Sequence, residues 1–98
     1  MRLTDIIWKV QFREKIMAKH GVTTDEVEQV VFGRPYVVRI GRGRIGQEDL
    51  YEAFGQTRGG RYLVVFFIHK RGAALPITAR VMTASERRYY EKQSSTKR

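Results

Sequence analysis

Cysteine is absent from the 98-residue chain, and histidine occurs only twice. Without cysteine there can be neither a disulfide bond nor a thiolate–metal site, and two histidines without a dense acidic cluster do not favour a metal centre. A run of about 18 apolar residues is also missing, as is the charged and then apolar N-terminal pattern of a secretory signal. We therefore expect a cytoplasmic protein that needs no metal ion or other cofactor.

Acidic residues are scarce. Aspartate and glutamate number 10 against 19 lysines and arginines, which gives a formal net charge of +9. No acidic residue lies between Glu52 and Glu86. Five cationic residues lie there instead: Arg58, Arg61, Lys70, Arg71 and Arg80. Each alone would be an ordinary solvated charge, but because they share one sheet-forming stretch we expect a surface that faces a polyanion, either nucleic acid or an acidic protein.

The longest apolar run covers residues 61–69 and is rich in β-branched and aromatic side chains. Glycine-containing turns bound it on both sides, which indicates a strand rather than a short helix. Both faces of this strand would be apolar, so we expect it at the centre of a sheet. A chain of this length holds one two-layer core. We expect a single domain over residues 1–93 and a frayed tail over 94–98.

Helical patterns occur in three places. The expected helices cover residues 9–20, 23–33 and 83–93. The second and third open on a Thr-x-x-Glu spacing, Thr23 to Glu26 and Thr83 to Glu86, in which the two side chains cap the start of the helix reciprocally. These signals indicate an α+β chain, with two helices before most of the sheet and one after it.

Four further strands are expected around the central one. They cover residues 2–8, 36–40, 49–57 and 75–81. The segment 58–60, Arg-Gly-Gly, resembles a hairpin turn that leads into the central strand. In the last strand, alternation places Leu75 and Ala79 on one buried face and Arg80 on the other.

Residues 41–46 spell Gly-Arg-Gly-Arg-Ile-Gly, which matches the G-x-G-x-x-G fingerprint of dinucleotide sites. The context does not fit, because the chain is too short for a doubly wound sheet and lacks an acidic residue about 20 positions further on. A flexible basic loop is the better interpretation. Arg42 and Arg44 on this loop would lie within reach of a polyanion.

Four short motifs carry a resemblance to a known family. They are Lys19-His20-Gly21-Val22 followed by an acidic helix, Gly60-Arg61-x-Leu-Val-Val, Ile77-Thr78-Ala79-Arg80 and Glu86-Arg87-Arg88-Tyr89-Tyr90. In this order, and in a basic chain of this length, they resemble the BrnT family of type II toxins. Each motif alone is weak, whereas the four together extend over most of the domain.

The resemblance implies a RelE/ParE-like α+β fold, with a small, mostly antiparallel twisted sheet, two N-terminal helices packed on it and a C-terminal helix. It also implies an endoribonuclease, an RNA interferase that inhibits translation and growth. The implied partners are the RNA substrate and a BrnA-like antitoxin with a ribbon-helix-helix part, through which alone the toxin reaches operator DNA. Three alternatives stay open: a non-catalytic RNA-binding module, a toxin of this fold that acts on a protein such as DNA gyrase, and an inactive relative that survives only in an antitoxin complex.

RNA can be cleaved without a metal when the ribose 2′-OH attacks the adjacent phosphorus, which requires a base, positioned cations and an acid. We expect Arg80 and Arg61 to clamp the phosphate in one cleft, since the guanidinium fork fits phosphate oxygens. His69 is the candidate base or acid because histidine titrates near neutral pH, although a satisfied histidine at a strand end explains it equally well. No carboxylate is expected in the sheet region. The resemblance adds Arg87 and Tyr90 to the catalytic residues, and packing of helix on sheet explains Tyr90 at least as well.

Further RNA contacts are expected from the loops and helices around these residues. The candidates are Arg58, Lys70, Arg71, Arg42, Arg44, Lys19, His20, Arg88 and Tyr89. Tyrosine rings suit stacking on the splayed bases of single-stranded RNA. For His20 a structural role is favoured, because a positive charge in the last turn of a helix complements the helix dipole.

Overall fold

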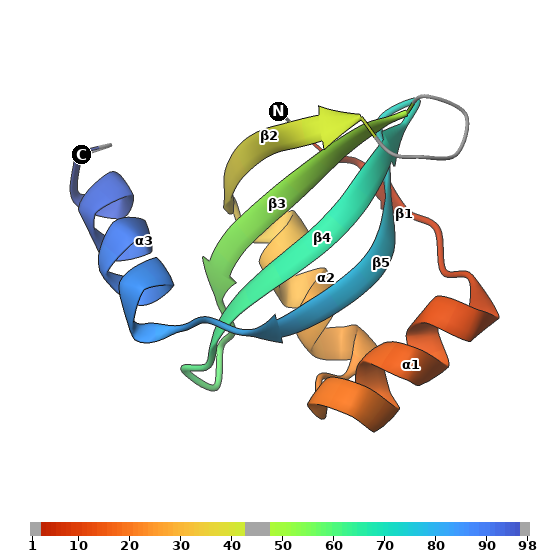
Figure 1. Ribbon diagram of the computed structural model, residues 1–98, viewed down its shortest axis with the longest axis horizontal. Coiled ribbons are helices and arrows are strands. Elements are labelled where there is room, and N and C mark those ends of the chain that lie inside the picture. The colour runs from red at the N-terminus through yellow and green to blue at the C-terminus, as the bar shows by residue number, and fades with distance from the viewer. Residues whose placement is uncertain (1–2, 43–47, 97–98) are drawn as a thin grey trace.

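The computed structural model describes residues 3–42 and 48–96 (Figure 1). In chain order the elements are β1 (Asp5–Ile6), α1 (Val10–His20), α2 (Thr24–Phe32), β2 (Tyr36–Arg42), β3 (Asp49–Gln56), β4 (Tyr62–Lys70), β5 (Ala73–Val81) and α3 (Ala84–Thr96). The strands form one sheet in the order β1-β5-β4-β3-β2, and every neighbouring pair is antiparallel except β1 with β5. The expected α+β fold with a small, mostly antiparallel sheet is confirmed.

Strand β4 is the middle strand, as its two apolar faces predict, and it pairs with β3 on one side and β5 on the other. Leu63, Val65 and Phe67 are fully buried in the core that the sheet forms with α1 and α2. Val64 and Phe66 project from the opposite face into a second, smaller cluster. We call the face that bears Leu63, Val65 and Phe67 the α1/α2 face, and the face that bears Val64 and Phe66 the α3 face.

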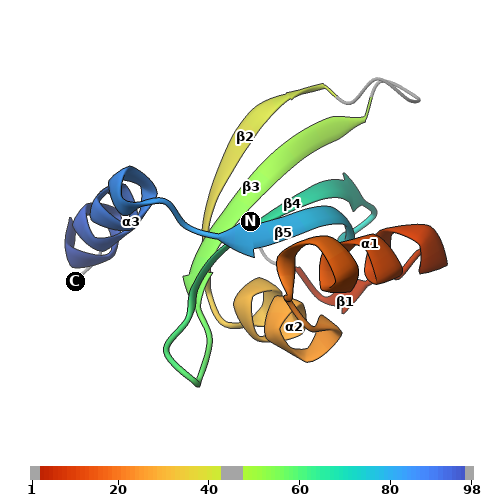
Figure 2. The same ribbon diagram turned by 60° about the horizontal axis from the view of Figure 1, so that its bottom comes forward.

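Helix α3 packs on the sheet through aromatic side chains. Tyr89 meets Tyr36 and Phe54 edge-on, with ring centroids 5.7 and 5.5 Å apart, and Tyr90 meets Tyr62 at 6.1 Å. Figure 2 shows α1 and α2 together on one side of the sheet, whereas α3 stands apart from them. The sheet therefore carries a closed core on one face and a smaller aromatic contact on the other.

The helix boundaries follow from local sequence signals. Thr23 Oγ1 accepts a hydrogen bond from the Glu26 N–H, and Glu26 Oε1 accepts one from the Thr23 N–H, both at 3.1 Å. Thr83 and Glu86 make the same reciprocal pair at the start of α3, at 3.2 and 2.8 Å. Helix α1 ends at Gly21, which adopts the left-handed φ of +62° that glycine tolerates best. Both expected capping boxes are thus confirmed.

The expected alternation along β5 is wrong. Its pairing with β4 skips Ile77, which forms a β-bulge and shifts the alternation by one position. Ala79 opposes Val65 and belongs to the core under α1 and α2, whereas Leu75 opposes Ile68. Because Val65 and Ile68 point to opposite faces of β4, Leu75 and Ala79 do not share a face.

Some boundaries also differ from expectation. Strand β1 is shorter than the strand expected over residues 2–8. Helix α3 continues to Thr96, into the segment expected as a tail over 94–98. The loop expected over 41–46 falls largely outside the described residues. In the described ranges, the helices lack the length and apolar character that crossing a membrane requires.

Candidate active site

Arg80 lies near the end of β5 on the α3 face, where it opposes Val64 of β4. Its Nη1 and Nη2 donate hydrogen bonds to Glu86 Oε1 and Oε2, at 2.6 and 2.8 Å, and its Cζ lies 5.5 Å from the centre of the Phe66 ring. A guanidinium fork holds the oxygens of a phosphate by the same two-point geometry. Glu86 therefore takes the place on Arg80 that a phosphate would take.

The Arg80–Glu86 pair makes the stability of the fold sensitive to acid. The hydrogen bonds from Arg80 lower the pKa of Glu86 from 4.5 to about 2. A carboxylate whose pKa is lower in the folded state stabilises the fold above its unfolded-state pKa, and this contribution is lost as the pH falls through the folded-state pKa. We expect the free energy of urea unfolding to fall by about 2 kcal/mol more in the native protein than in Glu86→Gln between about pH 5 and pH 2. Equal acid losses in the two proteins would contradict this interpretation.

A second cation and two tyrosines lie beside this pair. The Arg87 Cζ is 4.0 Å from the centre of the Tyr62 ring, and Tyr62 in turn contacts Tyr90. The Arg87 side chain is 54% exposed, so its guanidinium is accessible to a ligand. Cations that bind phosphates and rings that stack on bases are the usual means of holding single-stranded RNA. The structure thus places Arg80, Arg87 and Tyr90, three of the expected catalytic residues, on one face.

Two residues expected to bind RNA, Arg88 and Tyr89, are on the same helix. The Tyr89 hydroxyl donates a hydrogen bond to the Tyr36 hydroxyl at 3.4 Å, and this bond raises the pKa of Tyr89. Arg88 is exposed and donates to Ser85 Oγ at 3.3 Å. Tyr89 therefore adds an aromatic ring to this face, whereas the bond recorded for Arg88 stays within α3.

Arg61 reaches the opposite side of the sheet. Its Nη1 donates to both carboxylate oxygens of Glu26, at 2.8 and 3.0 Å, and to the carbonyl oxygen of Gly21 at 3.2 Å. The expectation that Arg61 and Arg80 share one cleft is wrong, because one side chain joins the α1–α2 layer and the other the α3 face. Arg61 ties the β3–β4 turn to the start of α2, which is a structural role.

His69 also projects from the α1/α2 face, near the far end of β4. Its ring meets Tyr51 edge-on at a centroid distance of 6.1 Å, and its Nε2 is buried without a hydrogen-bond partner among the residues that the structure describes. On β4, Val64 is the residue opposite Arg80, and His69 lies five positions beyond Val64. Five positions correspond to about 17 Å along a strand. The expected joint action of His69 and Arg80 on one phosphate does not fit this separation.

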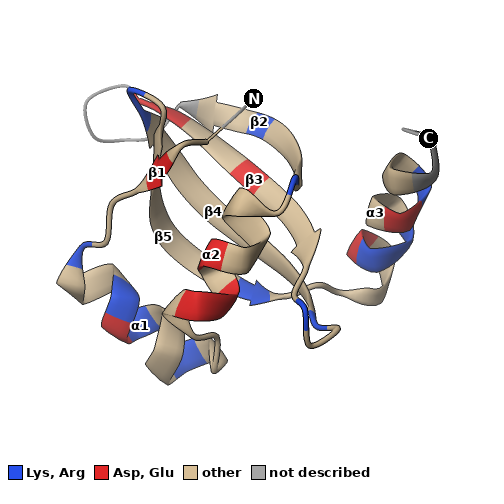
Figure 3. Cartoon of the chain, turned by 180° about the vertical axis from the view of Figure 1, so that it is seen from behind, with Lys and Arg blue, Asp and Glu red and all other residues tan. Residues whose placement is uncertain are grey.

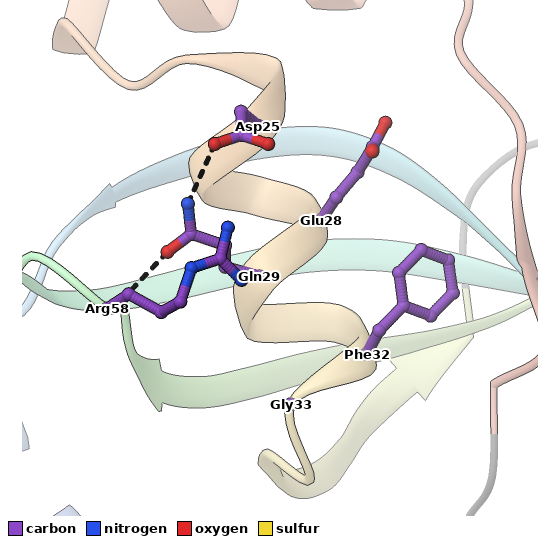
Figure 4. Close-up of a pocket in the computed structure, with 6 residues that line it drawn as sticks. All are labelled: Asp25, Glu28, Gln29, Phe32, Gly33 and Arg58. Carbon is purple, nitrogen blue, oxygen red and sulfur yellow. Dashed lines mark hydrogen bonds between the residues drawn. The ribbon is translucent and has the colours of Figure 1, made fainter.

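Arg58 lies in the turn between β3 and β4, close to α2. Its backbone N–H donates a hydrogen bond to Gln29 Oε1 at 2.8 Å. Its side chain lines a shallow pocket whose other lining residues include Asp25 and Glu28 (Figure 4). Figure 3 shows the acidic residues of α2 on this side of the molecule. These carboxylates would repel a polyanion, so the surroundings of Arg58 do not favour RNA.

The other expected RNA contacts lie at separate places. Lys70 and Arg71 are at the β4–β5 turn, and Lys19 and His20 are at the end of α1. The Nζ of Lys70 pairs with Glu48 at 3.3 Å. The side chain of Arg42 and all of Arg44 lie outside the described residues. The cationic stretch was expected to form a single surface that faces an anion. This expectation is wrong, because the cations of the stretch are distributed over both faces and both ends of the sheet.

One acidic side chain on the α3 face was not expected. Glu52 of β3 opposes Phe66 of β4, so it projects from the same face as Arg80. Burial raises the pKa of Glu52 and the charge of Glu86 raises it further, while Arg80 opposes these effects. The expectation that the sheet region carries no carboxylate is therefore wrong.

Comparisons with known proteins agree with this fold. The family described as "Ribonuclease toxin, BrnT, of type II toxin-antitoxin system" matches residues 8–86. The crystal structure of the Brucella abortus ribonuclease toxin BrnT is similar, with 22% sequence identity and a TM-score of 0.59, and the similarity covers 82% of this chain and 97% of that chain. No curated protein sequence matches significantly. Because the family match extends over most of its length, the chain belongs to the BrnT family of ribonuclease toxins of type II toxin-antitoxin systems.

Proposed function

We propose that this BrnT-family protein is a metal-independent endoribonuclease that cleaves RNA on the α3 face of its sheet and thereby inhibits translation. The observation that carries the proposal is the guanidinium fork of Arg80, which lies on the same face as the exposed Arg87 and the rings of Phe66, Tyr62 and Tyr90. The family is described as a ribonuclease toxin, which supports the reaction class.

In this proposal Arg80 leaves Glu86 and holds the non-bridging oxygens of the scissile phosphate. Positioned charge of this kind is typically worth about 10²–10³-fold in rate. Arg87 adds a second cation, and Tyr62 and Tyr90 offer surfaces on which bases stack. The ribose 2′-oxygen attacks the phosphorus and the bond to the 5′-oxygen breaks, which leaves a 2′,3′-cyclic phosphate and a 5′-hydroxyl end.

A toxin of a type II system implies a cognate antitoxin. We propose that this partner is BrnA-like, with a ribbon-helix-helix part that binds operator DNA. The toxin would then contact the operator only through its partner, which agrees with the distribution of its cations over separate surfaces rather than along one DNA-binding element.

The reaction is tested by incubating the purified protein with a defined single-stranded RNA in the presence of EDTA and sequencing the RNA ends. We expect new 5′-hydroxyl ends at the same sites with and without the chelator. Binding without cleavage would favour the non-catalytic RNA-binding module. DNA damage in expressing cells without cleaved RNA would favour a toxin directed at gyrase, and either result would overturn the proposal.

A further inference from the structure

Glu52 lies on β3 and projects from the α3 face. In the register of the sheet it stands between Val38 of β2 and Phe66 of β4, two apolar neighbours that limit its contact with water. On β5, Thr78 opposes Phe66, and Arg80 lies two positions further along that strand. At ordinary strand spacings the Cα atoms of Glu52 and Arg80 are therefore about 12 Å apart. Both side chains are long enough to shorten this distance, and the charge of Arg80 acts on the Glu52 carboxylate.

Glu52 and Glu86 both have carboxylates near Arg80, and the bonding of the two differs. Glu86 is held by both arms of Arg80 and by the N–H of Thr83. In the part of the chain that the structure describes, the Glu52 carboxylate makes neither a hydrogen bond nor an ion pair, and only the backbone of Glu52 pairs with its neighbours in the sheet. A carboxylate already paired with a guanidinium is a weak proton acceptor, whereas one without such a partner is available for proton transfer.

The charged and titratable groups around Glu52 come from two elements. Arg80 of β5 favours the charged carboxylate, while Glu86 of α3 disfavours it, and Tyr89 of α3 lies near enough to sense its charge. Burial is the largest effect and raises the pKa of Glu52 above its ordinary value. A general base is most effective when its pKa lies near the operating pH, so this shift is in the useful direction.

We propose that Glu52 accepts the proton of the attacking 2′-OH in RNA cleavage. The assignment rests on the ribonuclease function proposed above. With the phosphate on Arg80, the ribose of the same nucleotide lies over Phe66, on the side of β3. The carboxylate takes the 2′-OH proton, the bond between the 2′-oxygen and phosphorus forms, the bond to the 5′-oxygen breaks, and the leaving oxygen takes a proton from water. Glu52 then returns its proton to the solvent, and no co-reactant is consumed.

The test is the Glu52→Gln variant, which keeps the size and polarity of the side chain and removes its basicity. Glu14→Gln is the matched control, because Glu14 is an exposed carboxylate on α1, on the other side of the sheet. We expect Glu52→Gln to cleave RNA about 10²–10⁴-fold more slowly and to lose the acid limb of the pH–rate profile. Its affinity for an uncleavable 2′-deoxy analogue should be unchanged or tighter, because a negative charge has been removed from the binding surface. The control should match the native protein in all three measurements.

The outcomes separate the two proposals. A native protein that leaves RNA intact would refute the ribonuclease function itself. A native protein that cleaves, together with a Glu52→Gln variant that cleaves within about threefold of it and keeps the acid limb, would refute the role of Glu52 alone. If the Glu52→Gln variant does not fold, the pH–rate profile of the native protein still tests the role of Glu52. A fall in rate on protonation of a group with a pKa above about 4.5 supports Glu52, and a flat profile from about pH 4 to pH 7 contradicts it.

Discussion

Replacing Arg80 with alanine is expected to slow RNA cleavage by about 10²–10³-fold and to abolish growth arrest on expression. The change removes the guanidinium fork that we place on the scissile phosphate. Glu86 keeps its capping hydrogen bonds with Thr83, so the start of α3 should persist. Initial rates on a fixed oligoribonucleotide measure the effect, and circular dichroism checks that the fold is retained.

Arg61→Ala is the matched control for this variant. Both arginines pair with the glutamate of a capping box, Arg61 with Glu26 and Arg80 with Glu86, but they do so on opposite faces of the sheet. Loss of the partly exposed Arg61 pair should lower the free energy of unfolding by about 1 kcal/mol and leave the cleavage rate near that of the native protein. Full activity in Arg80→Ala, or an equal loss of activity in the two variants, would contradict the assignment of the site to the α3 face.

Replacing Phe67 with alanine is expected to lower the free energy of unfolding by about 3–5 kcal/mol. Its side chain is 0% exposed, lies in the core under α1 and α2, and stacks on Tyr51 with ring centroids 5.5 Å apart. A domain of this size is typically stable by only about 5–15 kcal/mol, so the cavity would remove a large share of its stability. Urea unfolding followed by circular dichroism measures the loss.

The neighbouring Phe66→Ala variant distinguishes the two faces of the same strand. Phe66 is only half-buried and lies beneath the guanidinium of Arg80. We expect it to cost about 1–2 kcal/mol of stability and to weaken RNA binding, because the variant removes a ring from the proposed binding face. If Phe67→Ala were the milder change for stability, or if Phe66→Ala left RNA affinity unaltered, the assignment of core to one face and ligand to the other would be contradicted.

Much of the fold is predictable because its signals are local. The apolar run around Phe67 predicts a central strand, and the two Thr-x-x-Glu spacings predict the helix starts that the structure contains. The position of Glu52 is also implicit in the predicted hairpin. Pairing Gln56 with Tyr62 across the turn and counting outward places Glu52 opposite Phe66. The register of this hairpin, rather than a sequence motif, is the signal that locates the carboxylate.

The division of the arginines between the two faces depends on contacts that the local sequence does not encode. The bulge at Ile77 shifts the alternation of β5, and only the packed sheet determines which side chains on it share a face with those of β4. Glu26 and Glu86 are recognisable as capping residues, yet their second role as partners of Arg61 and Arg80 arises when α2 and α3 dock on the sheet.

The most direct test of the central claim, that RNA binds on the α3 face, is ultraviolet cross-linking of a uridine-rich, cleavage-resistant oligonucleotide, with the attached residues identified by mass spectrometry. If the bases contact this face directly, we expect cross-links at Tyr62, Phe66 or Tyr90. An excess of competing RNA should reduce the cross-links at these positions. Cross-links confined to Trp8 or Tyr51, which pack against the core under α1 and α2, would contradict it.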